Sequence, residues 1–182
     1  MTAALVGGCT SHRKHPSATT APATTLAPVV LKVDVRASAE GGAPGAAKGA
    51  TAKATPGMRR FLTTYLTDAF LDPNQRQKAY QDLLGLFDAT VQASAKRDLP
   101  ALSLADEAAG LHDVRPTSAK AAVTFLLQGR DVVAATAHVV FDGTAVGGQG
   151  KGSIKATADL QLLAAGSGWR IVGYDAHTGP PA

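Results

Sequence analysis

The sequence predicts an α+β fold in which N-terminal helices pack on a curved antiparallel sheet, preceded by a disordered tail. Two changes of pattern along its 182 residues support this prediction. From residue 58, apolar side chains recur every three or four positions, which is typical of helices. From residue 119 they recur at every second position, which is typical of strands with one buried face. A run of helices followed by a run of strands indicates an α+β domain.

Residues 10–57 are expected to form a low-complexity tail and linker. The segment "TSHRKHPSATTAPATTLAP" at 10–28 contains too little apolar surface to offset the entropy of ordering. In "VVLKVDVRA" at 29–37, apolar and charged residues alternate, which predicts a strand that could dock on the edge of the main sheet. The Gly- and Ala-rich residues 38–57 show no periodicity and are predicted to be a linker.

The domain itself, residues 58–182, is predicted to begin with an amphipathic helix. Its apolar face consists of Met58, Phe61, Leu62, Tyr65, Leu66, Ala69 and Phe70. Asp72 is a candidate cap for a second helix, which would bury Ala79, Tyr80, Leu83 and Leu84. Asp88 is a candidate cap for a third helix over residues 89–97. Residues 99–110 fit either a helical turn or a loop.

Four strands are predicted after residue 110. The faces expected to be buried are Ala121, Val123, Phe125 and Leu127; then Val133, Ala135, Ala137, Val139 and Phe141; then Ile154, Ala156, Ala158, Leu160 and Leu162. The last strand is "WRIVGYDA" at 169–176. Residues 128–131 and 165–168 are expected to form tight turns, and the glycine-rich residues 142–152 a longer loop.

The basic charge lies in the tail. The net charge is +4 and the isoelectric point about 9.4, but residues 10–57 hold six basic and two acidic side chains. Residues 58–182 therefore carry twelve of each sign and are neutral. A neutral domain argues against nucleic acid as a partner, whereas a basic tail suits an anionic membrane surface.

The single cysteine stands in a context that resembles the lipobox of bacterial lipoproteins. Val6, Gly7, Gly8 and Cys9 supply the aliphatic residue, the two small residues and the thiol. This resemblance implies that Cys9 is acylated and becomes the new N-terminus, that residues 1–9 are the remnant of a signal peptide, and that a membrane is a partner. Because "MTAALVGG" is shorter than a complete signal peptide, either the true translation start lies upstream or Cys9 is an incidental thiol in a disordered cytosolic tail. We expect the first, because a Thr-, Pro- and Ala-rich spacer begins directly after Cys9. The expected location is the outer face of the cytoplasmic membrane or the cell envelope.

Candidate catalytic and metal-binding residues are few. In an acid–base reaction, Tyr65 could donate a hydrogen bond to a negatively charged oxygen of the substrate. His138 and Asp159 are the candidate general bases, but both are predicted to face solvent. His12 and His15 lie three apart beside Arg13 and Lys14 in the tail, without a third ligand. The glycines of residues 147–152 precede neither a helix nor a Lys-Ser/Thr pair, so they do not form a phosphate loop. We therefore expect neither a metal nor a cofactor.

The order of the elements, ending in "GWRIVGYD" at 168–175, resembles the nuclear transport factor 2-like superfamily, which includes ketosteroid isomerase-like and cystatin-like folds. It also resembles actinobacterial lipoproteins and Mce-associated proteins, in which a lipobox, a Pro/Thr/Ala tail and such a domain occur together. These resemblances imply a cone-like arrangement of helices on the sheet.

The expected function is that of a non-catalytic, membrane-tethered lipoprotein that binds a lipid, another apolar ligand or an envelope protein. Tyr65, Trp169 and Tyr174 are the candidate residues for a ligand cavity or partner surface, because aromatic side chains dominate such sites. The alternative is a small pocket enzyme of the ketosteroid isomerase or polyketide cyclase type.

Overall fold

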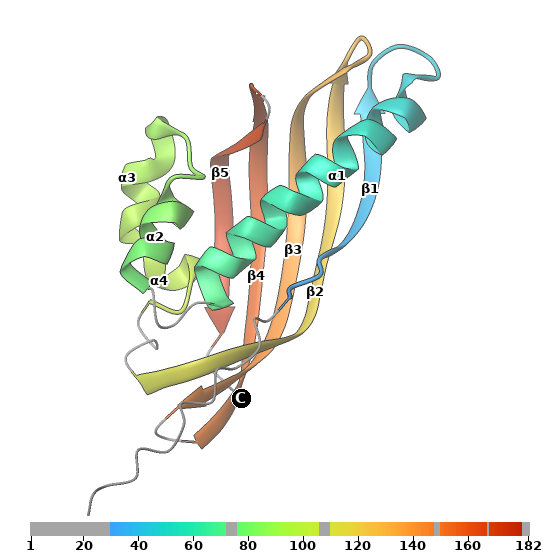
Figure 1. Ribbon diagram of the computed structural model, residues 1–182. Helices are drawn as coiled ribbons and strands as arrows, with labels where there is room; N and C mark the ends of the chain where they lie inside the picture. Colours follow the sequence, from blue (N-terminus) through green and yellow to red (C-terminus); the bar gives the residue numbers. More distant parts are fainter. Residues whose placement is uncertain (1–29, 72–75, 106–109, 148–149, 167, 180–182) are drawn as a thin grey trace, which may run out of the picture.

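The computed structural model describes residues 30–71, 76–105, 110–147, 150–166 and 168–179 (Figure 1). These residues form an α+β fold with an open, mixed sheet of five strands. The elements in chain order are β1 (Asp34–Gly41), α1 (Ala46–Leu66), a π-helical turn (Thr67–Leu71), α2 (Arg76–Leu84), α3 (Ala89–Arg97), α4 (Leu99–Leu102), β2 (Leu111–Gln128), β3 (Asp131–Gly147), β4 (Gly150–Ala165) and β5 (Gly168–Gly179).

The strands follow one another across the sheet in the order β1-β2-β3-β4-β5. Strands β2 to β5 form the expected antiparallel meander, and β1 joins its edge parallel to β2, from Asp34 opposite Lys120 to Gly41 opposite Leu127. Helix α1 lies diagonally across one face of the sheet, while α2, α3 and α4 gather beside β5 (Figure 1). The predicted α+β class and the order of helices followed by an antiparallel meander are confirmed. The prediction of a purely antiparallel sheet was wrong, because β1 precedes the helices and pairs in parallel with β2.

The strand predicted at 29–37 joins the sheet, but it begins and ends later than expected. Leu31 and Val33 are buried ahead of β1, and Lys32 and Arg36 are exposed, as the alternation predicts. Residue 29 lies outside the described residues. Strand β1 then continues to Gly41, because its backbone pairs with β2 through Leu127.

The prediction of a linker over residues 38–57 was wrong. Residues 38–41 belong to β1, and α1 begins at Ala46, well before Met58. Pro56 and Gly57 suggested a break, since both residues disfavour helix interiors. The helix continues through them because its later turns bury Met58 and Leu62 completely against the sheet, and this burial outweighs local propensity.

The shorter helices follow the sequence signals closely. Asp88 caps α3 as predicted, its carboxylate accepting a hydrogen bond of 3.0 Å from the Thr90 backbone N–H. The ambiguous segment after Leu99 begins with the single turn α4. The proposed cap Asp72 lies outside the described residues. Leu83 and Phe87 are buried, and Tyr80 and Leu84 half-buried.

The predicted buried faces of the strands are confirmed, with one exception. Val133 is 38% exposed. Leu126 pairs with Ala134 and Leu127 with Val132, so Val133 is the extra residue of a bulge and leaves the inner face.

The prediction of a loop over residues 142–152 was also wrong. Strand β3 continues to Gly147 and β4 begins at Gly150, with Gly143 opposite Ile154. Glycine is needed here for close packing: a Cβ on Gly147 would lie 2.3 Å from the Gly110 carbonyl oxygen. Residues 148–149 lie outside the described parts.

Candidate functional site

Tyr65 belongs to the core. It is 1% exposed on α1, and burial raises the pKa of its hydroxyl. With Phe70, Val139 and Phe141 it lines a small, partly open cavity of about 10 Å³. Such a cavity has room for roughly one water molecule, so it is too small for an organic ligand. Among the described residues, no hydrogen bond reaches the Tyr65 hydroxyl.

Tyr174 connects the last strand to the helices. Its hydroxyl donates a hydrogen bond of 2.7 Å to the Asp98 carboxylate, and its ring meets Phe87 edge-on with 5.4 Å between centroids. Desolvation, followed by the hydrogen bond and charge of Asp98, raises the pKa of Tyr174 to about 12. These contacts indicate a structural role.

Trp169 lies at the start of β5 and is half-buried. Its ring stacks on that of the buried Phe125, with 5.9 Å between centroids and 30° between planes. The stacking holds one side of the indole against the core. Trp169 also lines an open groove of about 440 Å³, and Tyr65 and Tyr174 do not. The structure therefore does not bring the three predicted aromatic residues into one site.

The groove lies between the N-terminal half of α1 and the turns that join neighbouring strands. Helix α1 contributes Ala50, Lys53, Ala54, Pro56, Gly57 and Arg60. The second wall consists of Arg130 in the β2–β3 turn with Asp131 and Val132 at the start of β3, and of Gly166 in the β4–β5 turn with Gly168 and Trp169 at the start of β5. Its volume falls within the range of about 300–1,000 Å³ that is usual for small-molecule sites.

The groove is basic although the folded part as a whole carries little net charge, with sixteen basic and fourteen acidic side chains over residues 30–182. Three basic side chains line the groove, Lys53, Arg60 and Arg130, and one acidic side chain, Asp131. None of these four side chains forms an ion pair with another residue in the described ranges. Cations without partners around a concave surface attract anions, because the field of several like charges adds within the groove.

Sequence reasoning missed this groove except for Trp169. Ala50, Lys53, Ala54, Gly57 and Arg60 recur at helical spacing, which places them on one face of α1. The signal was present, but all of these residues except Arg60 lie in the segment that was predicted to be a linker. The two turns give no pattern that links them to α1 in the sequence.

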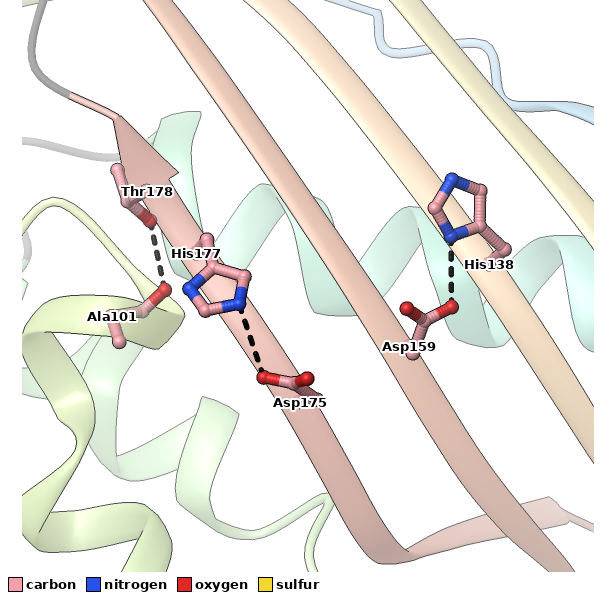
Figure 2. A network of polar contacts seen from close by, with 6 residues as sticks. All are labelled: Ala101, His138, Asp159, Asp175, His177 and Thr178. Atoms are coloured by element: carbon pink, nitrogen blue, oxygen red, sulfur yellow. Dashed lines mark hydrogen bonds and ion pairs between the residues drawn. The ribbon is translucent and has the colours of Figure 1, made fainter.

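The face of the sheet opposite α1 carries two imidazole–carboxylate pairs (Figure 2). His138 Nδ1 lies 2.8 Å from Asp159 Oδ1, and His177 Nε2 lies 3.2 Å from Asp175 Oδ1. All four side chains are exposed. His138 and Asp159 therefore face solvent, as the alternation predicts, and the sheet separates them from Tyr65.

These pairs form no metal site, since no group of three ligand-type side chains occurs within the part of the chain that the structure describes. Cys9, His12 and His15 lie outside the described residues. None of the described helices combines the length and apolar character that crossing a membrane requires. The chain matches no protein-family model, no curated protein and no solved structure.

Proposed function

We propose that this chain is a non-catalytic binding module of the cell envelope, tethered to the membrane by acylated Cys9, which holds a small ligand in the groove beside α1. The main support is the groove itself: a concavity of about 440 Å³ that contains a half-buried tryptophan and three cations that form no ion pair with the residues that the structure describes. Ligand sites combine apolar side chains with polar groups that fix the orientation of the ligand, and the groove contains both kinds.

The groove is a better candidate than the interior of the domain. The space under the sheet is filled by side chains such as Phe70 and Phe141, which stack with 4.9 Å between centroids. The cavity beside them is about 10 Å³. A ligand inside the domain would require these side chains to move, whereas the groove is open to solvent.

The tether is supported by the sequence. The lipobox-like residues Val6 to Cys9 are followed by a Thr-, Pro- and Ala-rich spacer, which suits an extended connection between a lipid anchor and a domain. The basic residues of that spacer would favour an anionic membrane surface. The outer face of the cytoplasmic membrane or the cell envelope is therefore the proposed location.

The fold family is also a proposal. A long helix across an antiparallel meander supports a nuclear transport factor 2-like or cystatin-like domain, similar to Mce-associated proteins. The parallel edge strand β1 is an addition that the resemblance does not imply.

The alternative, an isomerase- or cyclase-type pocket enzyme, has less support. Its reaction needs a general base and an oxyanion donor within reach of the same substrate. Tyr65 is buried on one side of the sheet, while His138 and Asp159 are exposed on the other. These residues cannot contact one substrate, so the binding module is the function that the geometry supports best.

Filling the groove tests this function. Gly57 lines the groove, and a Cβ at Gly57 meets no atom within 4 Å. We expect Gly57→Phe to occupy the groove without disturbing the packing of α1. Native mass spectrometry of the full chain, purified from its host, should show a small-molecule adduct on the wild-type protein and none on Gly57→Phe.

Gly49→Phe is the matched control. Gly49 lies on the same helix, has equal space at its Cβ and does not line the groove. This variant should keep the adduct. An adduct that persists on Gly57→Phe, or a wild-type protein without any adduct, would refute the groove as the ligand site.

A further inference from the structure

We propose that the ligand of this groove is a phosphate monoester on an apolar body, with the phosphate held by Lys53, Arg60 and Arg130 and the apolar body lying on Trp169. This inference rests on the proposed function and adds the chemical class of the ligand. A lipid with a phosphate headgroup and a soluble aromatic phosphate both have this chemistry.

The cations surround the groove from two sides. Lys53 and Arg60 are seven residues apart on α1, so they lie on the same face, about 10 Å apart along the helix axis. Arg130 approaches from the β2–β3 turn. A ligand between them would meet positive charge from both the helix and the sheet.

A dianionic phosphate fits this charge better than a neutral or zwitterionic group. Three cations against Asp131 alone leave a net charge of +2 in the groove. Guanidinium groups present N–H donors in a planar fork that matches phosphate oxygens, and charge-assisted hydrogen bonds of this kind are among the strongest in proteins. The ligand would supply the partners that these side chains lack within the described structure.

The remaining wall of the groove is apolar. Ala50, Ala54 and Val132 line it together with Trp169. Because Phe125 stacks on the indole, Trp169 is held in a fixed orientation and offers a preorganised surface. When the phosphate of the ligand lies beside the cations, the apolar body of the ligand can reach this wall.

Trp169 also provides the measurement, because it is the only tryptophan of the chain. The full chain, produced without acylation, is titrated with short-chain dihexanoyl phosphatidic acid and, separately, with phenyl phosphate, while tryptophan fluorescence is followed. Both probes should give a saturable change that weakens as the salt concentration rises. Uncharged dihexanoylglycerol and inorganic phosphate serve as probes that lack one half of the ligand.

Variants locate the site. Arg60→Gln and Arg130→Gln should each weaken binding of phosphatidic acid by about tenfold or more, because each removes a charge-assisted contact. Arg59→Gln, on the neighbouring position of α1 and outside the groove, should leave binding unchanged. Gly57→Phe should abolish binding, and Gly49→Phe should not.

Several results would overturn the ligand class. If dihexanoylglycerol binds as tightly as phosphatidic acid, the cations do not select the ligand; if inorganic phosphate binds as tightly, the apolar wall contributes nothing. A fluorescence change that survives in Gly57→Phe places the ligand elsewhere. If neither phosphate probe binds while the native adduct persists, the ligand class fails and the binding function stands.

Discussion

Tyr174 shows how one side chain can join the two halves of this fold. It lies on β5, and its hydroxyl reaches Asp98, which lies between α3 and α4. Two further contacts support the same junction: Thr178 Oγ1 donates to the Ala101 carbonyl oxygen at 2.9 Å (Figure 2), and an Arg170 guanidinium N–H donates to the Gly85 carbonyl oxygen. Side chains of the last strand thus connect the sheet to the segment that contains α2, α3 and α4.

Tyr174→Phe is expected to lower the free energy of unfolding by about 0.5–1 kcal/mol, because it removes one hydrogen bond and keeps the ring against Phe87. Urea unfolding at pH 7 measures this change. The Asp98 carboxylate forms no helix-capping hydrogen bond, so Asp98→Ala removes the same contact from the other side. The double variant should cost less than the sum of the two single variants, and strict additivity would show that the bond contributes nothing.

The pH dependence of Tyr174→Phe follows from the same contact. The pKa of Tyr174 in the folded protein, about 12, lies above that of an unfolded tyrosine, about 10. Its contribution to stability is therefore complete below pH 10 and is lost as the pH rises through 12. Tyr65 also has a raised pKa, so Tyr174→Phe should make the alkaline loss of stability smaller without removing it.

At the scale of elements, the connection between β1 and α1 depends on glycine. Gly42 and Gly45 both have φ near +78°, in the left-handed region that disfavours residues with a Cβ. Their surroundings differ. A Cβ on Gly42 would lie 2.7 Å from the Leu127 Cβ and 2.8 Å from the Gly129 carbonyl oxygen, whereas a Cβ on Gly45 meets nothing within 4 Å. Gly42 therefore lets the chain pass close to the β2–β3 turn.

Gly42→Ala and Gly45→Ala form a matched pair. Gly45→Ala should cost about 1 kcal/mol, because only the backbone strain changes. Gly42→Ala should cost at least about 1 kcal/mol more, since steric overlap with Leu127 and Gly129 adds to the same strain. Chemical denaturation of both variants measures the difference, and equal losses would contradict the close approach at Gly42.

At the scale of the whole molecule, the positive charge is shared between the tail and the folded part. Residues 30–182, which include β1 and α1, hold sixteen basic and fourteen acidic side chains, so half of the net charge of +4 lies outside the tail. The three groove cations are a local concentration of this charge. Binding and membrane attachment are therefore expected to be separate properties, the first belonging to the groove and the second to Cys9.

Cys9→Ala tests the tether. When the gene is expressed from its native locus, the protein should be in the membrane fraction, and intact mass should show a diacylglyceryl group on an N-terminal Cys9. Cys9→Ala should release the protein into the soluble fraction. A soluble wild-type protein with an unmodified Cys9 would refute the anchor and leave the groove unaffected.

The candidate site could be predicted from sequence only in part. Trp169 was identified because aromatic side chains dominate ligand and partner sites, but the same reasoning selected Tyr65 and Tyr174, which serve the core and the junction with the helices. Lys53, Arg60 and Arg130 were not identified. Arg130 is distant in sequence from Lys53 and Arg60, and only the packing of α1 on the sheet brings the three side chains to one groove.

The sequence by itself determined the α+β class, the inner faces of the strands and the cap of α3, because periodicity and capping are local properties of the chain. Tertiary structure decided the rest. Burial extended α1 backward through Pro56 and Gly57, strand pairing placed β1 beside β2, and a bulge turned Val133 outward. The groove has the same origin: contacts between residues far apart in the chain depend on packing, and no local pattern records them.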